Sequence, residues 1–189
     1  MENQPIEVEF KFPVDSLEAI RSKLESLGAT SIDSCIQQDE YLNDPLRDFA
    51  KLDIALRIRQ VDDQYWLTFK GPNLDPDAKI RREIETSLLN QQAAEELRDT
   101  FLSIGFYSVA TVSKKRECMS LVWQHLLVEA SLDEVDEVGP FVELEILVHH
   151  EAEVEGAKNC LQSLSAELEL VNSTRTSYLA MLLKNRGQL

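Results

Sequence analysis

The amino-acid sequence predicts an α+β fold in which an antiparallel sheet or barrel is covered on one side by helices. Three observations predict it. Segments that alternate apolar and polar residues fill most of the chain, with few helical segments between them. Strands and helices do not alternate regularly, which argues against a parallel sheet. The alternating segments also repeat charged residues on one face, which suits a sheet that closes around a polar tunnel.

The strands are expected from a period of two, which begins with "IEVEFKF" at residues 6–12. Here the apolar residues point one way, while Glu7, Glu9 and Lys11 point the other. Similar segments follow along the chain. The expected strands are 5–12, 29–42, 53–60, 64–71, 78–88, 107–117, 120–124, 126–134 and 140–149.

Four helices are expected from apolar residues at helical spacing, at residues 15–28, 90–105, 151–166 and 173–185. Asp15 or Ser16 can cap the first of them, and Gly28 can end it. Residues 70–79 contain Pro and Asp and are typical of a hairpin loop. Because no linker rich in Gly, Ser or Pro interrupts the chain, we expect one domain over residues 1–189.

The chain is strongly acidic, with 34 Asp and Glu against 19 Lys and Arg and a formal net charge of −15. Such a surface repels nucleic acid and anionic lipid, so neither is an expected partner. No signal peptide and no membrane-spanning apolar stretch is visible. The three cysteines have no paired or metal-binding spacing, which favours reduced thiols. We therefore expect a cytoplasmic protein.

Sorting each expected strand by parity gathers the charged residues on one of its two faces. A single charged face is explained most simply as the solvated side of an antiparallel sheet. That explanation weakens here, because the motif Glu-x-Glu and pairs of basic residues at positions i and i+2 recur from strand to strand. The basic residues on these faces are Lys11, Arg57, Arg59, Lys70, Lys79, Arg81, Lys114 and Arg116. The acidic ones are Glu7, Glu9, Glu83, Glu85, Glu129, Asp133, Glu143 and Glu145.

Charges gathered inside a tunnel are costly unless they are paired or bind a ligand. A triphosphate with a divalent metal would satisfy both signs. Arginine and lysine neutralise phosphate oxygens, and paired carboxylates hold hard cations such as Mg²⁺ or Mn²⁺. The parity pattern therefore favours a small-molecule triphosphate as the ligand, despite the negative charge of the whole chain.

Ordered motifs along the whole chain resemble the CYTH superfamily, the triphosphate tunnel metalloenzymes. Glu7-x-Glu9-x-Lys11 is similar to the ExExK signature of that family. The blocks that follow in order are "ALRIR" (55–59), "LTFKGP" (67–72), "RREIE" (81–85), "SKKR" (113–116), "LDEVDEVGPFVELE" (132–145) and "TSYLAML" (176–182). Residues 44–59 look most like the class IV adenylyl cyclase branch, although Asp44 and Ile54 depart from its pattern.

The resemblance implies an eight-stranded antiparallel β-barrel, open as a tunnel, with helices packed outside. It also implies a role for each charged residue, with Mg²⁺ or Mn²⁺ as cofactor. The implied triphosphate-binding residues are Lys11, Arg57, Arg59, Lys70, Arg81, Lys114 and Arg116. The implied metal ligands are Glu7, Glu9, Glu143 and Glu145, with Glu85 and Glu129 as further candidates. The implied catalytic residues are Glu7, Glu9, Lys11, Glu83 and Asp133.

The resemblance implies a cyclase that converts ATP to cyclic AMP and pyrophosphate. Two alternatives remain open at this point. The same charged tunnel suits hydrolysis of inorganic triphosphate or thiamine triphosphate, because both chemistries depend on positioning and charge neutralisation. It also suits a non-catalytic module that binds a nucleotide or polyphosphate. A homodimer is a further expectation, because dimers are common in the cyclase branch.

Overall fold

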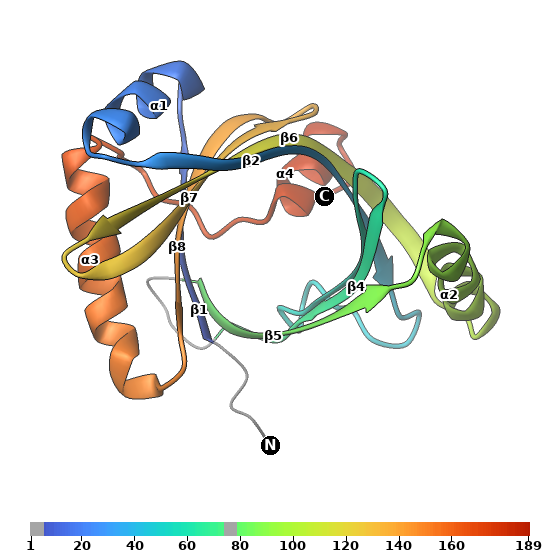
Figure 1. The fold of residues 1–189 in the computed structure, drawn as a ribbon. Coiled ribbons are helices and arrows are strands. Elements are labelled where there is room, and N and C mark those ends of the chain that lie inside the picture. Colours follow the sequence, from blue (N-terminus) through green and yellow to red (C-terminus); the bar gives the residue numbers. More distant parts are fainter. Residues whose placement is uncertain (1–5, 74–78) are drawn as a thin grey trace.

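Eight antiparallel strands close into a barrel in the computed structural model, which describes residues 6–73 and 79–189. Figure 1 shows the strands as a ring. Around the barrel they follow the order β1-β5-β4-β3-β2-β6-β7-β8. Their bounds are β1 Ile6–Pro13, β2 Thr30–Asn43, β3 Ala55–Val61, β4 Gln64–Lys70, β5 Lys79–Leu88, β6 Tyr107–Trp123, β7 Leu126–Val135 and β8 Gly139–Val148. The predicted fold class is confirmed.

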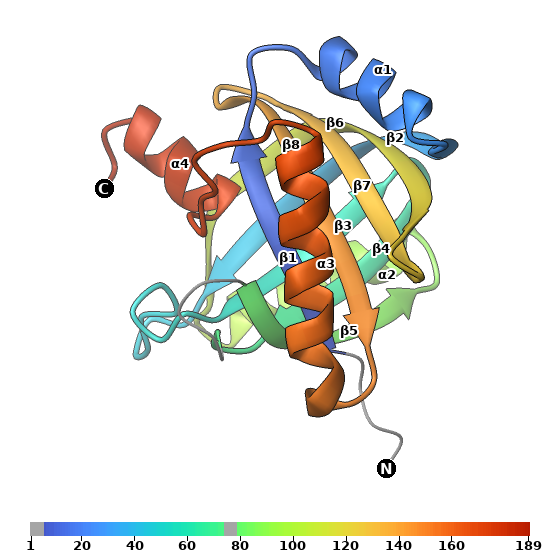
Figure 2. The same cartoon turned by 90° about the vertical axis from the view of Figure 1, so that its left-hand side faces the viewer.

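The helices pack outside the barrel, at α1 Leu17–Ser26, α2 Gln91–Ser103, α3 Val154–Glu167 and α4 Tyr178–Asn185. Polar side chains cap three of them. In each of these helices a backbone N–H of the first turn donates to the side chain of the residue just before the helix. These residues are Ser16 before α1, Asn90 before α2 and Ser177 before α4. Helix α3 runs along the outer face of β1 and β8, whereas α4 lies at one end of the barrel (Figure 2).

Two sequence predictions differ from the structure, and a third falls partly outside the described residues. The strands predicted at 107–117 and 120–124 are a single strand, β6, because Cys118 and Met119 continue its ladder with Ser131 and Ala130 of β7. The last helix begins only at Tyr178, because Ser177 is its cap. The predicted loop at 70–79 includes residues 74–78, which lie outside the described residues.

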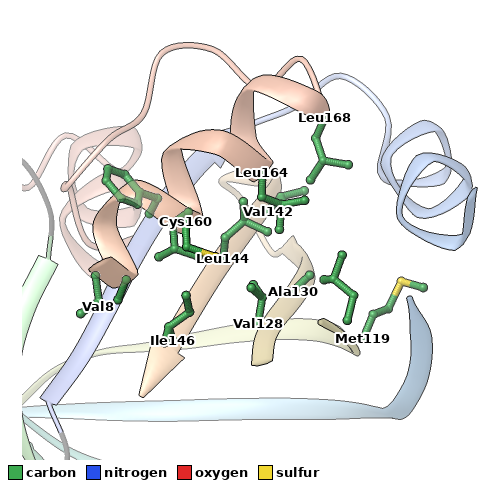
Figure 3. Close-up of a cluster of buried hydrophobic side chains, with 14 of the residues drawn as sticks. Val8, Met119, Val128, Ala130, Val142, Leu144, Ile146, Cys160, Leu164 and Leu168 are labelled. Atoms are coloured by element: carbon green, nitrogen blue, oxygen red, sulfur yellow. The ribbon is translucent and has the colours of Figure 1, made fainter. Parts of the chain in front are cut away.

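The main hydrophobic core lies between the barrel wall and α3, not inside the barrel (Figure 3). Val8 of β1, Val128 of β7 and Leu144 of β8 are fully buried there. They pack in one cluster with Leu161 and Leu164 of α3. Because side chains alternate along a strand, burying this face against helices directs the opposite, charged face into the barrel.

Within the described part of the chain, none of the helices combines the length and the apolar character that crossing a bilayer requires.

Candidate functional site: a charged tunnel through the barrel

The barrel encloses a cavity of about 1040 Å³ whose lining is dominated by ionisable side chains. The sequence-predicted residues that line it are Glu7, Glu9, Lys11, Arg57, Arg59, Lys70, Arg81, Glu83, Glu85, Lys114, Arg116, Glu129, Glu143 and Glu145. The remaining predicted residue, Asp133, is completely buried in the wall, where it contacts two of these cations. The structure thus brings the predicted residues together, and their chemical roles remain predictions.

Strand register sets which charges are neighbours. On one side of the barrel, Glu9 of β1 lies opposite Glu145 of β8, which in turn lies opposite Glu129 of β7. Two residues further along the same face, Lys11 of β1 lies opposite Glu143 of β8. Facing residues in an antiparallel pair have their side chains within about 5 Å of each other. The register alone therefore builds a row of carboxylates beside an ion pair.

A first cluster of cations is organised by Asp39 of β2. Arg59 donates to both of its carboxylate oxygens, with Nε–Oδ1 at 2.7 Å and Nη2–Oδ2 at 3.0 Å. Arg57 donates to Oδ2 at 3.2 Å. Burial alone would raise the pKa of the Asp39 carboxyl, but the two guanidinium groups outweigh it and hold that pKa well below its usual range. Asp39 is therefore an ionised anchor for both arginines.

A second cluster is built in the same way around Asp133 of β7. Arg116 donates to both of its oxygens, at 2.6 Å and 2.5 Å, and Lys114 donates to Oδ2 at 3.0 Å. The hydroxyl of Tyr178, at the start of α4, also donates to Oδ2, at 2.9 Å. The Tyr178 ring lies 3.9 Å from the Nζ of Lys11, a cation–π contact. Helix α4 thereby contributes directly to the tunnel wall.

Two lysines connect the clusters to the acidic residues. Lys11 contacts Glu143 at 2.9 Å. Lys70 contacts both Glu7 and Glu83 at 2.8 Å. Burial alone would lower the pKa of Lys70, but Glu7 and Glu83 outweigh it and raise that pKa above its usual value. Charge pairing of this kind offsets part of the cost of burying the ions.

Two buried guanidinium nitrogens have no hydrogen-bond partner within the described residues, namely the Nε of Arg57 and the Nε of Arg81. Both side chains line the cavity. A buried donor without an acceptor costs about 1–3 kcal/mol, and more when it carries charge. Such donors are stabilised by an anion with several oxygens, so they favour a polyanionic ligand at this position.

The acidic side of the tunnel fits a divalent cation by the chemistry of its donors. The candidate ligands are all carboxylates, the oxygen donors that Mg²⁺ and Mn²⁺ prefer. Burial, with Glu7, Glu9 and Glu129 nearby, raises the pKa of Glu145 well above its usual value, and a bound cation would relieve this repulsion. Among residues 6–73 and 79–189, no three Asp, Glu, His or Cys side chains already surround one point as ligands. These carboxylates would therefore converge on the ion as it binds.

Part of the cavity is apolar. Much of its apolar lining comes from the end of β2, the start of β3 and the segment between them, together with the start of β6 and α4. The segment between β2 and β3 lies at the same end of the barrel as α4 (Figure 2). These residues are Leu42, Phe49, Ala50, Ile54, Leu56, Tyr107, Val109, Leu179 and Leu183, and Ile84, Leu147 and Leu189 line the cavity as well. The cavity therefore joins a strongly charged region to an apolar one.

Sequence reasoning missed Asp39 and Tyr178. Asp39 lies in the strand predicted at 29–42, where Gln37 and Asp39 alternate with Gln38 and Glu40, so parity alone did not distinguish an inner face. Tyr178 lies in the helix predicted at 173–185, where its spacing with Met181 and Leu182 indicates an apolar stripe and not a polar contact. Its contact with Asp133 joins residues 45 positions apart, and no local pattern predicts it.

Lys114 makes the site sensitive to pH. Burial and the adjacent Arg116 lower its pKa to about 8, although Asp133 and Glu143 act in the opposite direction. Above pH 8 the ligand-free protein loses this positive charge, so its affinity for a triphosphate should fall by up to about tenfold per pH unit. Calorimetric titration of inorganic triphosphate between pH 7 and 9 measures this slope.

The matched control is Lys114→Arg, because arginine keeps its charge over this range. The ligand itself titrates equally in both proteins, so only the difference between the two slopes reports on Lys114. Identical slopes would contradict the assignment.

Comparisons with known proteins agree over most of the chain. The model of the CYTH domain family matches residues 5–178. A Methanocaldococcus jannaschii protein named "Putative adenylate cyclase" is 38% identical over 140 residues, which cover 74% of this chain and 76% of that protein. The "Adenylate cyclase CyaB" of Aeromonas hydrophila is 26% identical over 168 residues, covering 87% and 81%.

Among solved structures, the PH1819 protein of Pyrococcus horikoshii is similar to this chain with a TM-score of 0.84 and 34% sequence identity. The match covers 95% of this chain and 99% of that protein. The barrel and its helices are therefore shared over nearly their whole length.

Proposed function

The chain belongs to the CYTH domain family, and from that premise we propose that it is a divalent-metal-dependent enzyme that acts on a small-molecule triphosphate inside the tunnel. The proposed reaction is that of a class IV adenylyl cyclase, in which ATP gives cyclic AMP and pyrophosphate. The names of the two relatives support this choice of reaction.

One observation carries the proposal. Buried N–H donors of Arg57 and Arg81 have no partner among the described residues and lie in the wall of a cavity lined by further lysines and arginines. Neither nucleic acid nor a membrane surface suits an enclosed site in a chain of charge −15. A triphosphate carries several charged oxygens on three linked phosphorus atoms, and a guanidinium group can donate two parallel hydrogen bonds to such oxygens.

The roles of the side chains follow from charge. In the cyclase reaction the ribose 3′-hydroxyl loses its proton to solvent and its oxygen bonds to the α-phosphorus. The bond from the α-phosphorus to the pyrophosphate oxygen breaks, and negative charge develops on the departing pyrophosphate. Arg57, Arg59, Lys114 and Arg116 are held in fixed positions by buried carboxylates, so they can stabilise that charge without reorganising. Glu7, Glu9, Glu143 and Glu145 would hold the metal, with Glu85 and Glu129 as further candidates. Bound Mg²⁺ or Mn²⁺ would supply Lewis-acid activation of the attacking and bridging oxygens.

The apolar part of the cavity supports an organic triphosphate rather than inorganic triphosphate. An inorganic chain needs only the charged region. At about 1040 Å³ the cavity is slightly larger than the range of roughly 300–1,000 Å³ that is typical of sites for whole small molecules. Side chains such as Phe49 and Tyr107 can contact a base or another aromatic group beyond the phosphates.

The test is an incubation of the purified protein with ATP, thiamine triphosphate or inorganic triphosphate, each with Mg²⁺ or Mn²⁺. Cyclic AMP and pyrophosphate formed in equal amounts from ATP are the expected products. Release of phosphate without cyclic AMP would instead identify a triphosphatase. Calorimetric binding without any product would identify a non-catalytic binding module, and the absence of both binding and product would contradict the proposal.

A further inference from the structure

We propose that Asp39 is a positioning residue, whose carboxylate fixes two arginines in the orientation that the reaction requires. This inference rests on the proposed function. Asp39 lies on β2 directly opposite Arg59 and diagonally beside Arg57, both on β3. It is 3% exposed, so its contacts are made inside the wall and not in solvent.

The two arginines need such an anchor. They are two residues apart on one strand, so both point into the tunnel, and their like charges repel each other. The Asp39 carboxylate accepts from the Nε and Nη2 of Arg59 and from the Nη1 of Arg57. These contacts use the edges of the guanidinium groups that face the wall.

The other nitrogens of Arg57 differ in their surroundings. Its Nη1 also lies 3.4 Å from the Tyr41 hydroxyl and its Nη2 lies 3.8 Å from Glu83. Its Nε is buried and has no partner among the described residues, although the side chain lines the cavity. Five donors in a rigid plane make an arginine effective only when the plane is held in one orientation. Asp39 also lines the cavity, but its carboxylate oxygens are occupied by hydrogen bonds from Arg57 and Arg59, so we infer that it acts through these arginines.

The variant Asp39→Asn distinguishes the effect of arginine orientation from the effect of net charge. The amide of Asp39→Asn keeps one acceptor oxygen but turns an NH₂ group toward a guanidinium donor, so the two-point contact with Arg59 is lost. At the same time the tunnel becomes more positive by one charge. Attraction of a polyanion depends on total charge, whereas stabilisation of a transition state depends on donors held in place.

The expected result is therefore a split between binding and turnover. Asp39→Asn should bind inorganic triphosphate in metal-free buffer as tightly as the wild type or up to about tenfold more tightly, with a stoichiometry of one. Its kcat should fall about 10- to 100-fold, since a displacement of about 1 Å costs about that much. Partial unfolding would lower kcat and stoichiometry together, and it would not tighten binding.

The matched control is Glu40→Gln on the neighbouring residue of β2. Glu40 also pairs with an arginine, the Nε of Arg98 lying 2.9 Å from both of its oxygens, but this pair is partly exposed on the outer face of the barrel. This variant removes a carboxylate charge from the same strand outside the tunnel and should change neither affinity nor kcat by more than about twofold.

A second variant and the wild-type protein provide further tests of the positioning role. If Asp39→Asn does not fold, Asp39→Glu takes its place, because it retains the charge but displaces it by one methylene. A kcat in the folded variant within about twofold of the wild type, or a parallel loss of affinity and stoichiometry, would overturn the positioning role. A wild-type protein that binds triphosphate without turnover would also overturn it. Absence of both binding and turnover in the wild type would contradict the proposed function itself.

Discussion

Replacing Arg81 by alanine is expected to weaken the binding of a triphosphate by about 30-fold without lowering the melting temperature. Arg81 lines the cavity, and its buried Nε has no acceptor within the described residues. Its Nη2 pairs with Asp53 at 3.4 Å, and the Asp53 side chain is 59% exposed. Loss of a hydrogen bond to a charged group costs about 2 kcal/mol, which corresponds to the stated factor.

The stability of this variant distinguishes Arg81 from the other cations. Removing Arg116 would leave Asp133 buried with fewer partners, and breaking a buried pair in that way costs about 3–5 kcal/mol. Among the described residues, removing Arg81 leaves the exposed carboxylate of Asp53 without this ion pair, so the folded state loses little. Affinity and stability should therefore respond separately at this position.

Arg82→Ala is the matched control for this prediction. Arg82 is the next residue of β5, so its side chain points to the outer surface and is exposed. Binding by calorimetry and melting by fluorescence or circular dichroism should both stay at the wild-type values. Equal effects of the two substitutions on affinity would show that net charge, and not the position of Arg81, attracts the ligand.

The inside and outside of the barrel could be predicted from the sequence because backbone geometry dictates them. Alternation in residues 6–12 places Val8 and Glu9 on opposite faces of the strand, and in the barrel these faces are the one packed against α3 and the one that lines the tunnel. The same rule applied to Arg57 and Arg59 and to Lys114 and Arg116. Charged residues repeated at this period therefore revealed which side chains would meet.

The pairing of those charges could not be predicted, because it depends on register and on distant contacts. Strand β2 carries polar residues on both faces, with Gln38 and Glu40 outside and Gln37 and Asp39 inside, so its alternation gave no clear inner face. A register shift between Ser31 and Asp33 changes its parity as well. Local patterns thus identified the charged groups but not the anchor that holds two of them.

Replacing Glu145 by glutamine is expected to stabilise the metal-free protein while lowering metal-dependent kcat/KM roughly 100-fold. Glu145 lies between Glu9 and Glu129 in the strand register, so the substitution removes repulsion among three neighbouring carboxylates. A gain of about 1 kcal/mol would raise the melting temperature by about 2–4 °C in a chain of this size. Loss of a metal ligand should cost at least as much as loss of a group that supports one, which is about 10- to 100-fold.

Melting temperatures with and without Mn²⁺ measure both the gain in stability of the metal-free protein and the loss of metal binding. Mn²⁺ should stabilise the wild-type protein, because an ion that binds only the folded state raises its stability, and it should stabilise Glu145→Gln much less. Glu134→Gln, at an exposed position of the same barrel, removes a carboxylate outside the tunnel and should leave the response to Mn²⁺ unchanged. If Glu145→Gln melts at or below the wild-type temperature and still responds fully to Mn²⁺, this row of carboxylates is not the metal site. Carboxylates gathered to bind a cation repel one another in the metal-free protein, so a cation site is expected to lower stability until the ion binds.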